Sequence, residues 1–291
     1  MTRDTGAVQD GLTVHVGCAM WTHRAWADQL PRPRGRHALD AYARRLTAVE
    51  GNTTFYALPD PATVTTWASL LPPSFRITPK LPRTITHDRR LRNAGTDLRV
   101  FLDRIEPLHA NLGPICVQLP ASFGPDDLGV LDRFLATVTD AHPWAVEVRH
   151  PAFAAGGSAE GALHRVLGRH GVDRVLLDST VLFNGPATGP TVTEARAHKP
   201  AVPVEPVALG TRPVLRLIGA LDLGACLAGW GHWIWTVRRW IDEGRAPLVF
   251  VHTADNAEAP TLARAVHAAI IEGNDALAPL PEPDDGPATL F

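Results

Sequence analysis

The chain has 291 residues, a formal net charge of −2 and 45% hydrophobic residues. This composition is typical of a soluble globular protein with a large core. It argues against a dedicated nucleic-acid-binding protein, because such proteins usually present a strongly basic face. No apolar run reaches the roughly 18 residues that a membrane span requires, so no membrane partner is expected.

The chain start and the cysteines favour a cytoplasmic protein. Residues 1–11 form a polar tail that contains two aspartates and does not resemble a secretory signal. Cys18, Cys116 and Cys226 lie far apart without CxxC spacing. That pattern favours reduced thiols over a disulfide framework or a structural zinc site. We interpret Cys18 as a small buried residue rather than a nucleophile.

Short apolar runs alternate with segments of helical periodicity along the chain. We predict strands at residues 12–16, 48–52, 75–80, 114–119, 144–148, 174–178, 213–218 and 248–252. Helices are expected at residues 37–47, 61–70, 98–110, 126–140, 161–170, 228–243 and 261–272. Residues 80–91 read as a loop, and residues 184–212 as a Pro/Gly-rich insertion with little regular structure.

Eight apolar runs with helices between them predict an α/β fold, a single (β/α)8 TIM-type barrel over residues 12–274. The insertion lies between strands six and seven. A doubly wound open sheet is the main alternative, but no glycine-rich dinucleotide or phosphate motif follows any of the predicted strands. Residues 275–291 are expected to form a loosely held C-terminal tail.

Polar residues gather where the predicted strands end, and in a barrel these ends share one mouth where ligands bind. The residues at or just beyond these ends are Cys18, Glu50, Asn52, Lys80, Gln118, Glu147, Arg149, Asp178, Arg216, His252, Asp255 and Asn256. The three carboxylates at the strand ends themselves meet three cations there. Burial requires such a balance, because an unpaired buried charge costs roughly 3–5 kcal/mol. For Glu50, the expected partner is Lys80 on the adjacent strand.

Partly desolvated carboxylates and a lysine can exchange protons with a substrate. We expect Glu147 or Asp178 to act as the base. Lys80 is then the acid or an electrostatic partner, and Glu50 could serve only to orient it. His87, in the loop that follows, is either a base or a loop cap.

A substrate would also need binding groups around these residues. Arg149 and Arg216 could clamp an anionic or polyhydroxyl ligand. Aromatic walls are expected from Trp21, Trp26, Phe55 and Tyr56, and further polar contacts from Asn52, Gln118 and Asn256. For Trp21 and Trp26, plugging the barrel is an equal alternative to ligand contact.

Glu50, Glu147, Asp178 and His252 are suitable ligand types for a divalent ion. However, no HxH, HxxE or paired-carboxylate spacing selects a ligand set, and cations are abundant at the same strand ends. The sequence therefore predicts no cofactor, with a divalent metal as the less favoured alternative.

Five sequence blocks resemble, in order, the YecE-like family, also called domain of unknown function 72. They are GCAMWTHRAW (17–26), VEGNTTFY (49–56), KLPRTITHDRRL (80–91), LGPICVQLPASF (112–123) and AVEVRHPAF (145–153). Weaker matches follow in LLDST (176–180), VLRLIG (214–219) and HTADNAEAPTLA (252–263). The resemblance covers almost all of residues 14–270 and implies a TIM-type barrel. It implies no defined reaction, although the family is loosely grouped with sugar isomerase-like barrels.

The resemblance also implies which polar residues are characteristic of the family. They correspond to Glu50, Asn52, Thr54, Tyr56, Lys80, Thr86, His87, Gln118, Glu147, Arg149, Asp178, Arg216 and Asn256. Three departures imply an altered specificity or a weakened activity. Gly51 replaces an aliphatic residue, Ile218 stands where histidine is common, and 252–253 is His-Thr instead of an aromatic residue and asparagine.

The leading hypothesis is a barrel enzyme that acts on a small sugar-like or anionic metabolite by acid–base chemistry, as an isomerase-like, lyase or hydrolase enzyme. The alternative is a non-catalytic barrel that binds a small molecule. Nucleic-acid processing is disfavoured by the net charge, although four arginines form a basic run within residues 83–92. The oligomeric state does not follow from these patterns.

Overall fold

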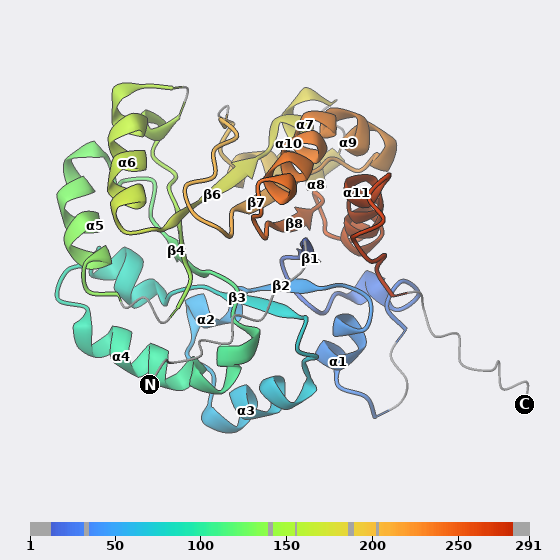
Figure 1. Cartoon of the computed structure of the whole chain (residues 1–291), viewed down its shortest axis with the longest axis horizontal. Helices are drawn as coiled ribbons and strands as arrows, with labels where there is room; N and C mark the ends of the chain where they lie inside the picture. Colours follow the sequence, from blue (N-terminus) through green and yellow to red (C-terminus); the bar gives the residue numbers. More distant parts are fainter. Residues whose placement is uncertain are drawn as a thin grey trace, which may run out of the picture.

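The computed structural model describes residues 13–31, 35–138, 142–154, 156–185, 189–201 and 204–281. Its centre is a sheet of eight strands that curls into a nearly closed barrel, with helices on the outside (Figure 1). The strands are β1 (His15–Cys18), β2 (Ala48–Gly51), β3 (Arg76–Pro79), β4 (Ile115–Gln118), β5 (Trp144–Glu147), β6 (Asp173–Asp178), β7 (Val214–Ile218) and β8 (Leu248–His252). The predicted (β/α)8 fold is confirmed.

The strand order is β3-β2-β1-β8-β7-β6-β5-β4, and the paired neighbours run parallel. The two end strands, β3 and β4, meet in a sparser seam. Two isolated parallel bridges join them, Ile77 with Leu112 and Lys80 with Cys116. The backbone N–H of Leu81 also donates to the carbonyl of Cys116 over 2.9 Å. These contacts bring the ring of strands together.

Between β1 and β2, the hydroxyl of Tyr42 takes part in the sheet. It accepts from the backbone N–H of Cys18 at 2.7 Å and donates to the carbonyl of Ala48 at 2.9 Å. The neighbouring position must be glycine, because a Cβ at Gly17 would lie 1.8 Å from the Ala48 carbonyl oxygen.

Side chains alternate between the barrel interior and the helical layer, because successive residues of a strand point to opposite faces. One contiguous interior cluster is apolar and consists of Ala48, Cys116, Ala145, Val175, Val214, Leu248 and Phe250. Two residues further along five of these strands, the same face carries Glu50, Gln118, Glu147, Arg216 and His252. The interior therefore changes from apolar to charged in a single layer, at the carboxyl ends of the strands.

The helices are α1 (Ala38–Ala43), α2 (Thr53–Tyr56), α3 (Pro61–Leu70), α4 (Gly95–Ile105), α5 (Leu128–Leu135), α6 (Ser158–Arg169), α7 (Thr180–Asn184), α8 (Gly189–His198), α9 (Leu223–Gly229), α10 (Gly231–Asp242) and α11 (Ala259–Ile271). Shorter helical turns are η1 (Arg24–Trp26), η2 (Thr84–Asp88), η3 (Glu106–Asn111), η4 (Pro125–Asp127) and η5 (Pro151–Phe153). Among the described residues, no helix is long and apolar enough to cross a membrane.

The insertion at residues 184–212 is more regular than predicted. Helix α8 occupies part of it, and its Val192 is buried in one cluster with Leu182 of α7 and Ile218 of β7. Residues 186–188 and 202–203 of the insertion lie outside the described residues. The apolar contacts of α8 outweigh a composition that is otherwise typical of a loop.

Two other segments also differ from the prediction. The helix expected at residues 228–243 is α10, which begins only at Gly231, and a separate helix that was not predicted, α9, precedes it and ends at Gly229. The loop at residues 80–91 contains the π-helical turn η2, and its end turns through positive φ at Arg90 and Leu91.

The predicted C-terminal tail is partly held by the core. Leu277 and Leu280 are buried and belong to the main hydrophobic cluster, so residues 275–281 pack more firmly than expected. Residues 282–291 and the predicted N-terminal tail, residues 1–11, lie outside the described residues. The three cysteines are buried, and each carries a free thiol.

Candidate active site at the barrel mouth

A buried ionic network fills the barrel mouth, with Arg216 at its centre. Nε of Arg216 on β7 lies 2.6 Å from Oε1 of Glu50 on β2, and its Nη1 lies 2.6 Å from Oε2 of Glu147 on β5. All three side chains are at most 4% exposed. Neither β2 nor β5 is a neighbour of β7 in the sheet. One guanidinium therefore joins carboxylates from separate parts of the barrel wall.

This network keeps both glutamates ionised. Burial alone would raise the pKa of Glu147, but Arg216, Arg149 and Lys80 outweigh it and lower the pKa to about 2. For Glu50, burial is likewise opposed, chiefly by Arg216, and its pKa lies well below the usual range. A carboxylate with so low a pKa is a weak base at neutral pH. These residues are therefore better suited to orient cations than to accept a proton.

Two further residues flank the network. His252 on β8 is buried, with Nε2 3.5 Å from Oε2 of Glu50 and 3.4 Å from Nη2 of Arg216. Burial lowers the pKa of His252 to about 4, so its ring is neutral at neutral pH. Arg149 donates from Nε to Oε1 of Glu147 over 2.8 Å, and its side chain is 29% exposed. Arg149 thus links the buried network to the outer part of the mouth.

Lys80 does not pair with Glu50, which corrects the sequence-based expectation. Its Nζ donates instead to Oε1 of Gln118 across the β3–β4 seam, over 2.6 Å. The reason is the sheet register, because Glu50 lies opposite Thr78 and Lys80 is two residues further along. The carboxylate of Glu50 is taken by Arg216.

Asn52 joins the end of β2 to the loop after β1. Its Nδ2 donates to the carbonyl of Ala19 at 2.6 Å and to Oε2 of Glu50 at 3.2 Å. The side chain of Asn52 is therefore a fixed support for the Glu50 carboxylate.

His87 lies on η2, and its imidazole is half-buried. Burial, Arg83 and Arg149 lower its pKa, and its ring contacts that of Phe55 on α2, which follows β2. Nδ1 lies 2.9 Å from the hydroxyl of Thr86, which itself donates to the carbonyl of Pro82 at 3.3 Å. This contact engages Nδ1 and leaves Nε2 of His87 without a hydrogen-bond partner among the described residues.

Asp178 does not join the network, although the sequence suggested it as a base. It lies opposite Leu217, whose side chain packs in the main hydrophobic core between the strands and the outer helices. Its carboxylate therefore points out of the barrel, where it accepts from the indole N–H of Trp233 on α10 and from the backbone N–H of Thr180 at 2.6 Å. This placement makes Asp178 an anchor between β6 and α10.

The two tryptophans near the chain start pack within the protein. Trp26 is 3% exposed, and its indole N–H donates to the backbone carbonyl of Asn256 at 2.7 Å. The ring of Trp21 meets that of Trp67 edge-on, with centroids 5.3 Å apart. Of the two interpretations left open by the sequence, the contacts of Trp26 favour a packing role.

Asn256 follows β8 in a left-handed conformation, with φ of 59°. Its Oδ1 is buried and has no hydrogen-bond partner among the described residues. The side chain of Asn256 therefore offers a hydrogen-bond acceptor, while its backbone carbonyl accepts from Trp26.

At the rim, three rings form a row. The ring of Phe55 meets both Tyr56 and His87 at nearly right angles, with centroids 5.1 Å apart in each pair. Tyr56 is 81% exposed. Large exposed aromatic rings are suited to stacking on a ligand, and this row ends at the imidazole of His87.

Sequence reasoning missed Lys199, which follows α8 in the insertion. Burial and the charges of Arg216 and Arg149 lower its pKa to about 8, against the two glutamates of the network. The neighbouring Pro200 is fastened to the end of β6, because its carbonyl accepts from the hydroxyl of Ser179. A signal was available in the sequence, since Lys80 and Lys199 are its only two lysines.

The residues weighed as metal ligands do not converge. Asp178 points outward, and both glutamates are held by Arg216. Across the part of the chain that the structure describes, no group of three or more His, Cys, Asp or Glu side chains could hold a metal ion. The arrangement at the mouth is an ionic network of carboxylates and cations.

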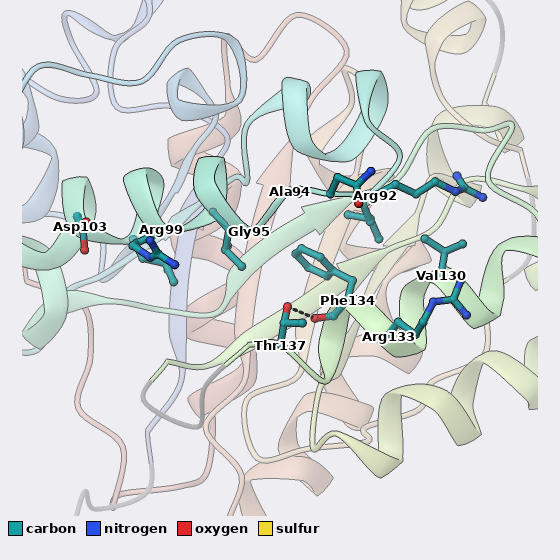
Figure 2. A pocket seen from close by; sticks show the side chains of 13 residues that line it. Arg92, Ala94, Gly95, Arg99, Asp103, Val130, Arg133, Phe134 and Thr137 are labelled. Carbon is teal, nitrogen blue, oxygen red and sulfur yellow. Dashed lines mark hydrogen bonds between the residues drawn. The ribbon is translucent and has the colours of Figure 1, made fainter.

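A separate hollow of about 750 Å3 lies between α4 and α5 on the outer layer (Figure 2). Its walls include Arg92, Arg99, Arg133 and Phe134, whose carbonyl accepts from the hydroxyl of Thr137. None of the sequence-predicted site residues lines this hollow. The predicted residues that do converge lie at the barrel mouth.

Comparison with known proteins agrees with this architecture. The family model described as "Protein of unknown function DUF72" matches residues 15–285. The UPF0759 protein YecE of Escherichia coli K12 is 37% identical over 249 residues, which cover 86% of this chain and 89% of that protein. YecE of E. coli O157:H7 is 36% identical over the same length.

Solved structures of the same family share the fold. A DUF72 protein from Enterococcus faecalis V583 superposes with a TM-score of 0.68 at 16% identity, over 89% of this chain and 95% of that one. One from Thermotoga maritima MSB8 gives a TM-score of 0.58 at 18% identity, over 86% and 96% of the two chains. With its resemblance to that family confirmed along most of its length, this chain belongs to the DUF72 family of barrel proteins.

Proposed function

We propose that this protein is an enzyme that binds a small polar metabolite at the barrel mouth and moves a proton on it. The observation that carries the proposal is the charged layer built directly above an apolar barrel core. Packing alone does not require it, because apolar side chains fill the layer below. Buried ion pairs contribute little net stability. Charges fixed at the ligand-binding end of a barrel do, however, orient and polarise a polar ligand.

The contacts suggest a division of roles within this site. His87 is assigned as the proton acceptor, because its pKa is lowered and its Nε2 nitrogen lies outside the Thr86 contact. The sequence suggested Glu147 or Asp178 as the base, but the pKa of Glu147, about 2, suits that residue better to hold Arg149 and Arg216 in place. Tyr56 offers its exposed ring as a stacking surface.

The proton-transfer proposal can be tested without a known substrate. The protein is incubated with a metabolite extract in D2O, and mass spectrometry follows compounds that gain one deuterium on carbon. We expect at least one such compound with the native protein and none with His87→Gln. His170→Gln is the matched control, because His170 contacts Asp132 on the outer helical layer and should leave the exchange unchanged.

The outcome that contradicts the enzyme proposal is equally concrete. A metabolite that is retained by the protein but recovered unchanged and without deuterium would identify a non-catalytic binding barrel. Exchange that survives His87→Gln in full would instead remove His87 from the proposed role.

The basic run at residues 83–92 adds no support for nucleic-acid processing. Arg89 lies 2.8 Å from Asp97, and Arg90 and Arg92 both contact Asp127, at 2.7 and 3.3 Å. Arginines paired with aspartates make a weak surface for phosphate backbones.

A further inference from the structure

We propose that the barrel mouth binds a dianionic oxyanion group of the metabolite, a phosphate monoester or a dicarboxylate, through the ammonium groups of Lys80 and Lys199. This inference rests on the proposed function insofar as it names the ligand class of the same site. It has its own test, because oxyanion binding is measured without turnover.

The first support is the charge balance of the mouth. Arg149, Arg216 and Lys80 belong to it by contact, and the hydrogen bond from Ser179 to the carbonyl of Pro200 fixes the backbone beside Lys199 at the end of β6. The only carboxylates within the network are Glu50 and Glu147, because Asp178 points out of the barrel. His252 is neutral at neutral pH. Among the described residues, the contacts of the network thus bring together three cations and two carboxylates, whereas the sequence predicts three of each.

The second support is the use of the carboxylate oxygens. Arg216 contacts both oxygens of Glu50, at 2.6 and 3.2 Å. Arg149 and Arg216 each take one oxygen of Glu147. Both glutamates are therefore committed to the arginines.

The two lysines are left without such partners. Within the described residues, neither ammonium has a carboxylate within 4.0 Å, and the acceptor recorded for Lys80 is the neutral amide of Gln118. Lys80 is nevertheless only 7% exposed. An ammonium buried beside a neutral amide has no anion in direct contact, and an oxyanion of the ligand would supply one.

The third support is the composition of the chain. Its 28 basic residues include only two lysines; one contacts Gln118 on the β3–β4 seam, and the other precedes Pro200, which is bound to Ser179 at the end of β6. Arginine fills every other basic position. An ammonium is a compact point charge that suits a phosphate or carboxylate group in a confined space. Within the described residues, neither of the two lysines has a carboxylate in contact.

Inorganic phosphate and malonate are suitable probes, one for each source of the oxyanion. Binding is measured by calorimetry at constant ionic strength. In parallel, trace acetylation with acetic anhydride and peptide mass spectrometry reports on the two lysines separately. We expect at least one probe to bind and to protect both lysines, whereas chloride and glucose should not. Protection by phosphate alone indicates a phosphate monoester, and protection by malonate alone indicates a dicarboxylate.

Variants identify the groups that bind. Lys199→Gln should weaken binding of the effective probe about tenfold, since a charge-assisted contact is lost. Lys199→Arg should restore most of it, because the charge returns. Arg133→Gln is the control, since Arg133 lines the outer hollow and should leave the affinity unchanged. Lys80→Gln should also weaken binding, provided that circular dichroism shows a native fold.

Two results would overturn the inference. One is binding of phosphate and malonate no tighter than that of chloride; the other is full affinity in Lys199→Gln. Deuterium exchange on a neutral metabolite, without oxyanion binding, would leave the enzyme proposal intact and remove only this inference. Oxyanion binding without deuterium exchange would support this inference and contradict the proposed proton transfer.

Discussion

Arg216 serves two carboxylates at once, so its loss has a large expected effect. In Arg216→Gln, Glu50 and Glu147 would face each other in a buried setting without their shared cation. Breaking a buried ion pair from one side costs about 3–5 kcal/mol. We expect a decrease of that order in the free energy of unfolding, measured with urea at pH 7.

Arg174→Gln is the matched control for that variant. Arg174 forms another buried ion pair, with Glu160, away from the mouth network. It should lower stability by a similar amount while leaving phosphate and malonate binding unchanged. Equal loss of oxyanion binding in both variants would mean that the effect of Arg216 on binding is only structural.

The outward orientation of Asp178 gives a prediction that separates anchoring from catalysis. Asp178→Asn retains one carbonyl oxygen but loses the negative charge of the carboxylate, whose two oxygens accept from Trp233 and Thr180. We expect a loss of about 1–2 kcal/mol in the free energy of unfolding. Deuterium exchange on the metabolite should continue at the native rate. A folded variant without exchange would restore Asp178 as the base that the sequence suggested.

At the scale of the elements, β1 and β2 depend on the close approach at Gly17. A methyl group there would meet the Ala48 carbonyl oxygen at 1.8 Å and disturb the contacts of the Tyr42 hydroxyl. We expect Gly17→Ala to lower stability by about 3 kcal/mol or more, or to prevent folding. Gly231→Ala, at the start of α10, has nothing within 4 Å and should be neutral or stabilising. Thermal unfolding of the two variants compares them, and a native-like melting temperature for Gly17→Ala would contradict the close packing.

The insertion shows how one element depends on distant contacts. Helix α8 has a weakly amphipathic sequence, GPTVTEARAH, in which Val192 is the buried residue. Its neighbours on α7 and β7 provide the apolar contacts, and the Ser179–Pro200 hydrogen bond fixes the segment that follows. This anchoring is what brings Lys199 to the mouth.

At the scale of the whole molecule, buried histidines set the response to acid. Burial lowers the pKa values of His15, His252 and His267 to about 4. In the unfolded chain these groups titrate near the ordinary histidine pKa of about 6.5. Their contribution to stability is therefore complete above pH 6.5 and is lost as the pH falls from 6.5 to 4. Each contributes a slope of up to about 1.4 kcal/mol per pH unit.

Urea unfolding at pH 7, 6 and 5 measures this dependence. His267→Gln should remove one proton from the uptake on unfolding and flatten the slope accordingly. A stability that stays constant over this range would show that the three rings are not held neutral. Below pH 4.5, protonation of Glu147 should add a further loss that continues towards pH 2.

Much of the architecture could be predicted because strand positions follow from short apolar runs. The runs placed each strand to within a few residues, and their carboxyl ends correctly brought Glu50, Gln118, Glu147 and Arg216 together. Whether each side chain points into the barrel or towards the helices was harder to predict. Asp178 lies three residues beyond the inward-facing Val175, so a period of two directs it outward.

Partners across the barrel could not be predicted, because they depend on the stagger between strands. The expected pair of Glu50 and Lys80 does not form, because Glu50 lies opposite Thr78, two residues before Lys80. The position of Lys199 depends on how the insertion folds, and the sequence of the insertion has no periodicity strong enough to predict that fold. Local patterns therefore located the site, whereas its pairing depends on contacts between segments far apart in the sequence.

The seam between β3 and β4 has a consequence for how the molecule responds to its ligand. The hydrogen bond between the side chains of Lys80 and Gln118 joins the two sides of this seam, in addition to the two isolated bridges. An oxyanion that binds Lys80 competes with Gln118 for the same ammonium protons. The proposed occupancy of the mouth would then be thermodynamically linked to closure of the ring of strands.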